Sequence, residues 1–426
     1  MKPPRVAFFT DSFYQVSGVG LTSREFAAFA QRRGLPFLSI HAGPKDGAIQ
    51  HGLLTTVEFQ RRWPRWNLEH DLSIDLFFFR HRGRLRAELA TFRPDLVHIT
   101  GPGDAGILGA MLAYEFKVPL VASWHTNLHE FAARRLAKAL AWMPAAACSG
   151  AARWTERHAL DLCVRFYRLA KLLFAPNPEL VELLAARTAR PAFLMTRGID
   201  ADLFSPARRT GADSEFVLGY VGRLSPEKNV RMLAEVERRL IQLGARNYRF
   251  LIVGEGQERA WLRRAMQHAE FPGVLRGVEL ARAYASMDVF LFPSATDTFG
   301  NVILEALASS VPSVVTPQGG PKFLVAHGVN GYVAQDPGEF AARAVDLMRN
   351  PALLSRMRRE SRRSAEPYSW DAVFDRVYAF YEFCFPPNRM WGGQSWSQPA
   401  FKPALADPSL RPVCSRFVGP SCPASR

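Results

Sequence analysis

Two acidic residues eight positions apart, Asp297 and Glu305, are the strongest candidates for chemistry in this sequence. A polar loop carries Asp297 and ends at Gly300, and a helical pattern then leads to Glu305. A helix rises about 1.5 Å per residue, so Glu305 would lie roughly 7.5 Å along the axis from Gly300, about the distance from the diphosphate of a sugar nucleotide to its ribose. The free N–H groups at the helix start suit the diphosphate, with Asp297 at the sugar and Glu305 at the ribose. The other interpretation is a loop acid and a surface glutamate.

Two basic residues, Arg223 and Lys228, form a second candidate group in the segment Gly222-Arg-Leu-Ser-Pro-Glu-Lys-Asn. They follow a strand pattern and bracket a tight turn, so a guanidinium and an ammonium could converge on one diphosphate. Together they would neutralise a leaving nucleoside diphosphate without a metal ion. Either residue alone could equally be a solvated surface cation.

The first half of the chain contributes a glycine pair and a histidine. Gly18 and Gly20 precede a helical pattern after the first strand, where glycines let a backbone approach a phosphate or sugar closely. The spacing is not the G-x-G-x-x-G of dinucleotide sites, and a plain turn is the other interpretation. His125 follows another strand pattern, at the sheet edge where ligands bind in open α/β folds. A lone histidine is otherwise usually structural.

The elements that must position these residues alternate between short apolar strands and helices, which is typical of parallel sheets covered on both faces. The predicted strands are Val6–Thr10, Phe37–Ile40, Leu96–Ile99, Leu120–Trp124, Ala192–Met195, Phe216–Tyr220, Tyr248–Val253, Val289–Phe292 and Ser313–Thr316. The predicted helices include Thr22–Arg33, Val230–Leu243, Arg259–His268, Val302–Ser309 and Phe340–Met348. The pattern predicts a doubly wound α/β architecture, present twice.

We expect four parts along the 426 residues. Residues 1–202 form one Rossmann-like domain and residues 203–369 form a second, with a linker near 202–214. Residues 370–385 form a helix that packs back on the first domain. Residues 386–426 are a flexible tail rich in proline.

Composition sets the class of protein. Apolar and charged fractions of 48% and 22% are those of a soluble globular protein, and no apolar run approaches the length of a membrane-spanning helix. Five cysteines without metal-type pairing indicate a reduced, cytoplasmic setting and no zinc site. The net charge of +15 calls for an anionic partner: nucleic acid, a membrane surface or a phosphorylated substrate.

A basic and apolar cluster lies between Phe131 and Leu172. Its basic members are Arg134, Arg135, Lys138, Arg153, Arg157, Arg165, Arg168 and Lys171. They alternate with leucines and aromatics, as in a helix that lies on an anionic bilayer surface. The equally weighted interpretation places the apolar residues in the protein core and the basic ones on a solvated rim.

The sequence resembles retaining glycosyltransferases of the GT-B fold, in the large family 4 that includes bacterial GDP-mannose-dependent α-mannosyltransferases and lipid glycosyltransferases. The motifs that carry the resemblance occur in consistent order from about residue 5 to residue 384. They are Thr10-Asp-Ser-Phe with Ser17-Gly-Val, Pro94-Asp-Leu-Val-His-Ile, Trp124-His-Thr-Asn, Arg197-Gly-Ile-Asp, Val221-Gly-Arg-Leu-Ser-Pro-Glu-Lys-Asn, Val253-Gly-Glu-Gly, Ala285-Ser-Met-Asp-Val-Phe-Leu-Phe-Pro-Ser and Thr296-Asp-Thr-Phe-Gly-Asn-Val-Ile-Leu-Glu-Ala. Asp297 stands where the family usually has Glu, Ser17 where Asn is frequent, and Ser310 where Gly is frequent.

The resemblance implies two Rossmann-like domains that face each other across a cleft, with residues 1–202 as the acceptor-side domain and residues 203–369 as the nucleotide-sugar-binding domain. It also implies a role for each matching residue. Arg223 and Lys228 would hold the donor diphosphate, and Glu305 the ribose. The transferred sugar would contact Asp297, the backbone of Phe299, Gly300 and Asn301, and Gly18 from the first domain. His125 would lie over the reacting sugar, and Arg197 would contribute from the domain junction.

The resulting hypothesis is a metal-independent retaining α-glycosyltransferase that moves a hexose, mannose from GDP-mannose, to a lipid or glycan acceptor. It would act in the cytoplasm, peripherally on the inner face of the cell membrane, without a nucleic-acid partner. A UDP-sugar donor and a catalytically silent nucleotide-sugar-binding protein remain alternatives. A nicotinamide oxidoreductase would need a dinucleotide fingerprint in the first loop, which is not evident. A nucleic-acid-binding protein would predict steep salt dependence.

Overall fold

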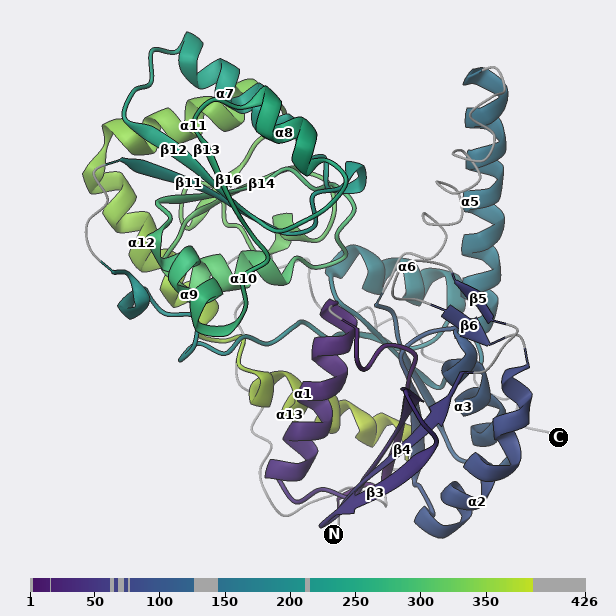
Figure 1. The fold of residues 1–426 in the computed structure, drawn as a ribbon. Helices are drawn as coiled ribbons and strands as arrows, with labels where there is room; N and C mark the ends of the chain where they lie inside the picture. The colour runs from purple at the N-terminus through teal and green to yellow at the C-terminus, as the bar shows by residue number, and fades with distance from the viewer. Residues whose placement is uncertain are drawn as a thin grey trace, which may run out of the picture.

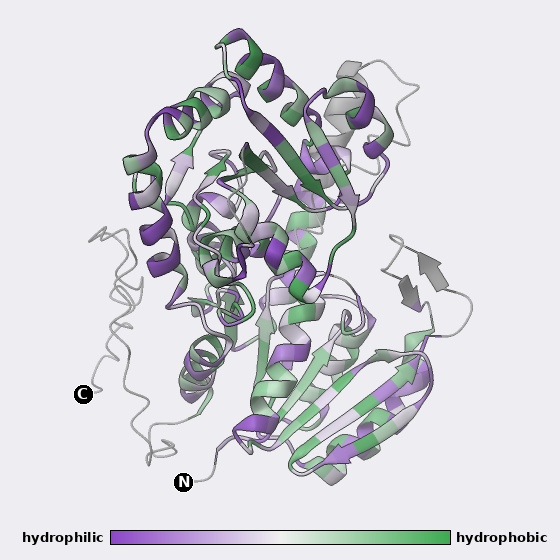
Figure 2. Cartoon of the chain, turned by 60° about the vertical axis from the view of Figure 1, so that its left-hand side comes forward, coloured by the Kyte–Doolittle hydropathy of each residue, from purple (hydrophilic) through white to green (hydrophobic). Residues whose placement is uncertain are grey.

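The computed structural model describes residues 3–15, 17–61, 65–67, 73–75, 77–125, 145–210 and 215–385. The chain forms two lobes, each a mainly parallel sheet covered by helices (Figure 1). The strands of both sheets are mainly hydrophobic and the exposed turns of the helices mainly hydrophilic (Figure 2). The predicted fold class, two Rossmann-like domains of the GT-B type, is confirmed.

The N-terminal lobe contains an eight-stranded sheet of order β10-β9-β8-β7-β1-β2-β4-β3, parallel except for the β3–β4 hairpin. Its strands are β1 (Val6–Thr10), β2 (Phe37–Gly43), β3 (Gly47–His51), β4 (Leu54–Gln60), β7 (Leu96–Ile99), β8 (Leu120–Ser123), β9 (Leu172–Ala175) and β10 (Ala192–Leu194); β5 (Arg65–Asn67) and β6 (Ser73–Asp75) pair separately. Its helices are α1 (Gly18–Arg32), η1 (Phe78–His81), α2 (Arg82–Phe92), α3 (Asp104–Glu115), α5 (Ala145–Tyr167) and α6 (Pro178–Thr188).

The C-terminal lobe contains a six-stranded parallel sheet of order β13-β12-β11-β14-β15-β16. Its strands are β11 (Phe216–Val221), β12 (Tyr248–Val253), β13 (Ala269–Gly273), β14 (Val289–Phe292), β15 (Ser313–Val315) and β16 (Gly331–Val333). The helices from the linker onward are η2 (Pro206–Arg208), η3 (Pro226–Lys228), α7 (Arg231–Gln242), α8 (Arg259–Ala265), α9 (Gly277–Ser286), α10 (Asn301–Ala308), η4 (Pro321–Phe323), α11 (Pro337–Arg349), α12 (Pro351–Ala365), α13 (Trp370–Tyr381) and η5 (Glu382–Cys384).

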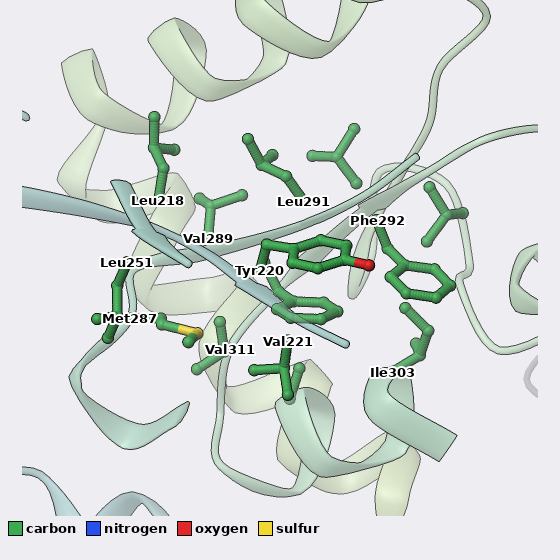
Figure 3. Close-up of a cluster of buried hydrophobic side chains, with 14 of the residues drawn as sticks. Leu218, Tyr220, Val221, Leu251, Met287, Val289, Leu291, Phe292, Ile303 and Val311 are labelled. Carbon is green, nitrogen blue, oxygen red and sulfur yellow. The ribbon is translucent and has the colours of Figure 1, made fainter. Parts of the chain in front are cut away.

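The strand order of each sheet determines where a ligand is expected. The first strand of each lobe, β1 or β11, lies inside its sheet, with later strands on both sides. The chain therefore leaves these strands toward opposite edges, which opens a crevice at their carboxyl ends, the switch point of a doubly wound fold. In the C-terminal lobe this point lies between β11 and β14. Apolar side chains from both strands, with Ile303 from α10, form the core beneath it (Figure 3).

The predicted strands are all present, and most of their bounds agree within two residues. Sequence reasoning missed β3, β4, β5, β6, β9, β13 and β16, most of which are short or lie near the sheet edges. The expected linker contains the short helix η2, and Arg209 pairs with Asp288 at 3.1 Å, so part of the linker packs on the C-terminal lobe. The domain boundaries given above stay predictions, and residues 386–426 lie outside the described part of the chain.

Helix α13 packs on the N-terminal lobe although it follows the C-terminal lobe in sequence. Phe374 stacks on Phe26 of α1, with ring centroids 4.4 Å apart. The Tyr381 hydroxyl shares a hydrogen bond of 2.6 Å with Nδ1 of His98, whose other ring nitrogen bonds to Ser123. All these groups are buried, so the contact joins apolar packing with a saturated polar network.

The first prediction concerns this network. Burial lowers the pKa of His98 to about 3 from its ordinary value of 6.5, so the folded protein leaves this ring neutral while the unfolded chain takes up a proton. The contribution of His98 to the free energy of unfolding is therefore fully present above pH 6.5 and decreases as the pH falls. At pH 5 the free energy of unfolding is lower by about 2 kcal/mol. The free energy of unfolding is measured by urea denaturation at pH 7 and at pH 5. Between these two pH values it should fall by about 2 kcal/mol less in His98→Gln than in the unmodified protein.

The matched control is His51→Gln, which changes an exposed histidine of the same lobe and should leave the pH dependence as it was. Equal losses for His98→Gln and the unmodified protein would show that His98 does not contribute to acid sensitivity.

Candidate functional site

The loops that follow β11 and β14 meet at the switch point of the C-terminal lobe. Lys228 ends η3, just after β11, and Asp297 lies in the loop after β14. The Lys228 ammonium donates a hydrogen bond of 2.6 Å to Oδ1 of Asp297. The side chains are 16% and 21% exposed, and Oδ2 of Asp297 is buried without a hydrogen-bond partner. The structure therefore pairs two residues that the sequence predicted for different parts of a donor.

Hydrogen bonds within the C-terminal lobe hold the loop that carries Asp297. The Thr296 hydroxyl donates to the backbone oxygen of Glu227 at 3.2 Å, which ties the loop to η3. The Gly320 N–H donates to the backbone oxygen of Asp297 at 2.7 Å. The ion pair is thus placed by backbone contacts on both sides, not by long side chains alone.

Two further hydrogen bonds connect this loop to the N-terminal lobe. The Thr298 hydroxyl donates to the backbone oxygen of His125 at 3.1 Å. The amide of Asn177 donates to the backbone oxygen of Thr298 at 2.7 Å, while its own oxygen caps α6. His125 and the Asp297 loop therefore meet at the junction of the two lobes.

The start of α10 follows directly and has no capping side chain. Its N-cap residue, Gly300, has φ 95°, and a Cβ there would lie 3.0 Å from Pro321, so the position favours glycine. The N-terminus of α1 lies across the junction, since a Cβ on Gly18 would lie 3.3 Å from the Asn301 amide. Two helix N-termini, from α1 and α10, thus approach one another between the lobes (Figure 1). Their positive ends and the free N–H groups of α10 suit an anion.

Glu305 lies further along α10, in contact with α9. The Tyr284 hydroxyl donates a hydrogen bond of 2.7 Å to Oε2 of Glu305. Burial raises the pKa of Glu305 from its ordinary value, and the bond from Tyr284 opposes that shift. Among the described residues, no lysine, arginine or histidine lies within ion-pair distance of this carboxylate.

His125 and Arg197 form a buried pair at the junction. An Arg197 N–H donates to Nδ1 of His125 at 2.7 Å, so that nitrogen is the acceptor and the neutral ring carries its proton on Nε2. Burial, and then the charge of Arg197, lowers the pKa of His125 well below its ordinary value. Burial also lowers the pKa of Arg197 to about 10, and its Nη1 has no hydrogen-bond partner. A neutral imidazole in one tautomer suits positioning rather than proton uptake.

Arg223 lies at the outer side of the same site. Its side chain is 59% exposed and lies 3.7 Å from Glu227. The Tyr220 hydroxyl donates a hydrogen bond of 3.1 Å to the backbone oxygen of Arg223. Burial, and then the charges of Asp297 and Glu227, raises the pKa of Tyr220 above its ordinary value. Phe299 is buried in the core of the C-terminal lobe, and the contact of its backbone with the transferred sugar stays a prediction.

The structure thus brings together most of the predicted residues, and it adds three that sequence reasoning missed. Thr298 and Asn177 join the lobes, and Tyr284 holds Glu305. Asn177 before Pro178 is a recognisable helix-cap signal, but it does not reveal the contact with Thr298. A tyrosine inside an amphipathic helix gives no signal for a contact with Glu305.

The predicted basic and apolar cluster is only partly within the described residues. Arg134, Arg135 and Lys138 lie outside them, as does the side chain of Arg153. The visible part, α5, extends away from the N-terminal lobe (Figure 1). Its apolar residues divide into two sets: Leu160, Val164 and Tyr167 pack on the core, whereas Trp154, Leu162 and, just past the helix, Leu169 are 63–69% exposed. In the part of the chain that can be described, no helix has the length and apolarity to cross a bilayer.

Comparison with known proteins agrees with this geometry. Residues 16–203 match the model of "Glycosyltransferase Family 4", and residues 215–350 match that of "Glycosyl transferases group 1". A GDP-mannose-dependent alpha-mannosyltransferase of Mycobacterium tuberculosis is 34% identical over 309 residues, which cover 70% of this chain and 75% of that relative. An alpha-monoglucosyldiacylglycerol synthase of Acholeplasma laidlawii is 24% identical over 65% of this chain and 72% of its own length.

Among solved structures, that of Anabaena HepE in complex with UDP and glucose superimposes with a TM-score of 0.62 at 17% identity, over 89% of this chain and 99% of that one. At that identity the likeness concerns the fold. The matched models, the mycobacterial relative and the two facing Rossmann-like sheets together place the chain in glycosyltransferase family 4, the glycosyl transferases of group 1.

Proposed function

We propose that this enzyme is a retaining α-glycosyltransferase that transfers a hexose, mannose from GDP-mannose, to a lipid or glycan acceptor. The Lys228–Asp297 pair beside the uncapped start of α10, opposite Gly18, is the observation that carries the proposal. It offers positive charge for a diphosphate and a carboxylate for sugar hydroxyls within a single contact. The name of the mycobacterial relative supports GDP-mannose as the donor.

The donor's diphosphate would lie against Lys228 and the N–H groups of α10, with Arg223 reaching in from the outer side. Glu305 would bind the ribose hydroxyls, and Asp297 the transferred sugar together with the Gly300 and Asn301 backbone. Fixed cations and amide dipoles cost little reorganisation when the anomeric bond breaks and negative charge develops on the diphosphate. The site therefore stabilises the leaving group without a metal ion.

Retention requires the acceptor oxygen to approach the face from which the diphosphate departs. The bond between the anomeric carbon and the diphosphate oxygen breaks, and a bond to the acceptor oxygen forms on the same face. The departing diphosphate takes the acceptor proton, so no protein nucleophile is needed. His125, kept neutral by burial and by the adjacent Arg197, positions the reacting sugar. Contact between the lobes limits water and hence donor hydrolysis.

Acceptor delivery is proposed at the cytoplasmic face of the cell membrane. The exposed Trp154 and Leu162 on α5 alternate with Arg157 and Arg165, and Arg168 and Leu169 follow just past its end, so an anionic bilayer surface could contact both kinds of residue. The relative named as a diacylglycerol-modifying synthase supports a lipid acceptor.

The second prediction tests the donor site. Lys228→Ala should raise the Kd of GDP-mannose by about 10- to 100-fold, because a hydrogen bond to a charged group is lost. A thermal-shift panel of GDP-, UDP- and ADP-sugars identifies the donor, and calorimetry then measures its Kd. Lys45→Ala, at an exposed lysine of the N-terminal lobe, is the control and should bind as the unmodified protein does. Equal affinity of Lys228→Ala and the control would contradict the assignment.

The third prediction follows from the ion pair. An intact sugar nucleotide offers a phosphate to Lys228 and hydroxyls to Asp297, whereas free GDP leaves the carboxylate facing a diphosphate. Asp297→Asn should therefore raise the Kd of GDP-mannose about tenfold and lower the Kd of GDP by a similar factor. Calorimetry with both ligands measures the two changes, and Asp346→Asn on α11 is the exposed control. A parallel loss for both ligands would show that Asp297 acts only by keeping the loop folded.

The fourth prediction concerns the membrane. At low salt the protein should co-sediment with vesicles that contain anionic lipid, and the bound fraction should fall several-fold in Arg157→Ser/Arg165→Ser or at high salt. The double variant Arg238→Ser/Arg363→Ser removes two exposed arginines from the C-terminal lobe and serves as control. Binding that is unaffected by the α5 changes would place the membrane contact elsewhere, and no binding at all would remove it from the proposal while leaving the chemistry intact.

A further inference from the structure

Tyr284 is a buried tyrosine with an unusual hydrogen-bond partner. It lies on α9 with no exposed surface, and its ring packs against Phe290 and Phe204 at centroid distances of 5.6 and 5.7 Å. Aromatic packing from two sides leaves the hydroxyl little freedom. The hydroxyl donates to Oε2 of Glu305 on the neighbouring helix α10. One helix thus fixes a carboxylate that another helix presents to the site.

A carboxylate in this position needs such a partner. Glu305 is partly buried and has no cation within ion-pair distance among the described residues, and burial alone favours its neutral form. The hydrogen bond from Tyr284 stabilises the charged form and selects one side-chain orientation. The other oxygen, Oε1, accepts no hydrogen bond from a described residue and is not a buried, unpartnered atom, so it is available to a ligand.

We propose that Tyr284 is a positioning residue for the nucleoside end of the donor: it holds Glu305 ionised and oriented so that Oε1 accepts hydrogen bonds from the ribose hydroxyls. The inference rests on the proposed function, because it takes the ligand to be a ribonucleotide. Because Tyr284 acts through Glu305, its proposed contribution is confined to ribose recognition. Both hydroxyls of a ribose are donors that an ionised carboxylate can accept together.

The structure offers a matched control in Tyr248. This tyrosine belongs to β12 of the same lobe, is 4% exposed, and has a buried hydroxyl without a hydrogen-bond partner. Tyr248→Phe removes the same atom from the same domain without breaking a hydrogen bond. A loss seen in Tyr284→Phe but not in Tyr248→Phe therefore reports the contact with Glu305 and not the removal of a buried hydroxyl in general.

The experiment compares two probes, GDP and 2′,3′-dideoxy-GDP, by calorimetry with the full-length protein, Tyr284→Phe and Tyr248→Phe. We expect Tyr284→Phe to raise the Kd of GDP about tenfold and to leave the Kd of the dideoxy compound unchanged. Tyr248→Phe should change neither. In transfer assays with the intact donor, the KM of Tyr284→Phe should rise by the same factor with little change in kcat, because ribose binding is equal in ground and transition states.

The possible outcomes distinguish a failure of the role proposed for Tyr284 from a failure of the proposed function. If Tyr284→Phe weakens both probes equally, or neither, while the unmodified protein prefers GDP, the positioning role is wrong and the proposed function stands. If the unmodified protein binds both probes with equal affinity, the ribose role of Glu305 fails and the inference fails with it. If uridine or adenosine diphosphate binds in place of GDP, the same comparison is made with that nucleotide and its dideoxy analogue, and the same expectations apply.

Discussion

The ion pair between Lys228 and Asp297 joins the two loops at the switch point, and the rest of the site is arranged around it. A parallel sheet brings these loops together because β11 and β14 are neighbours whose carboxyl ends point the same way. Hydrogen bonds from the Thr296 hydroxyl and the Gly320 N–H to backbone oxygens hold the loop in place, so the position of the charge pair does not depend on its two side chains alone. In the proposed reaction, the bound donor replaces this ion pair, because its phosphate contacts Lys228 and its sugar hydroxyls contact Asp297.

Among the residues that the structure describes, polar contacts join the two lobes, and one of them is an ion pair of 2.5 Å between Lys322 and Glu179. Thr298 bonds to the backbone of His125, Asn177 bonds to the backbone of Thr298, and Gly18 lies close to Asn301. Hydrogen bonds of this kind can be made and broken at modest cost, unlike a large apolar interface. The arrangement therefore suits two domains that hold a ligand between them and later release it.

Three buried or half-buried polar side chains are each held by a specific partner. Tyr381 and Ser123 satisfy His98, Arg197 satisfies one nitrogen of His125, and Tyr284 satisfies one oxygen of Glu305. In the low dielectric of the interior such bonds select one orientation and one protonation state. His98 contacts α13 through Tyr381, whereas the other two belong to the proposed donor site. The same physics thus serves stability in one place and ligand recognition in the other.

The sequence by itself determined the repeated strand–helix pattern, the family resemblance and the short segments that carry Arg223, Lys228, Asp297 and Glu305. These depend on local periodicity and on the order of motifs, both of which can be read directly from the sequence. Only the tertiary structure decided that Lys228 pairs with Asp297, that Tyr284 supports Glu305, and which apolar residues of α5 face the core. Those contacts join positions up to 69 residues apart, or depend on which side of a helix faces a neighbour. No local pattern encodes such a distance, because it follows from how the sheets and helices pack.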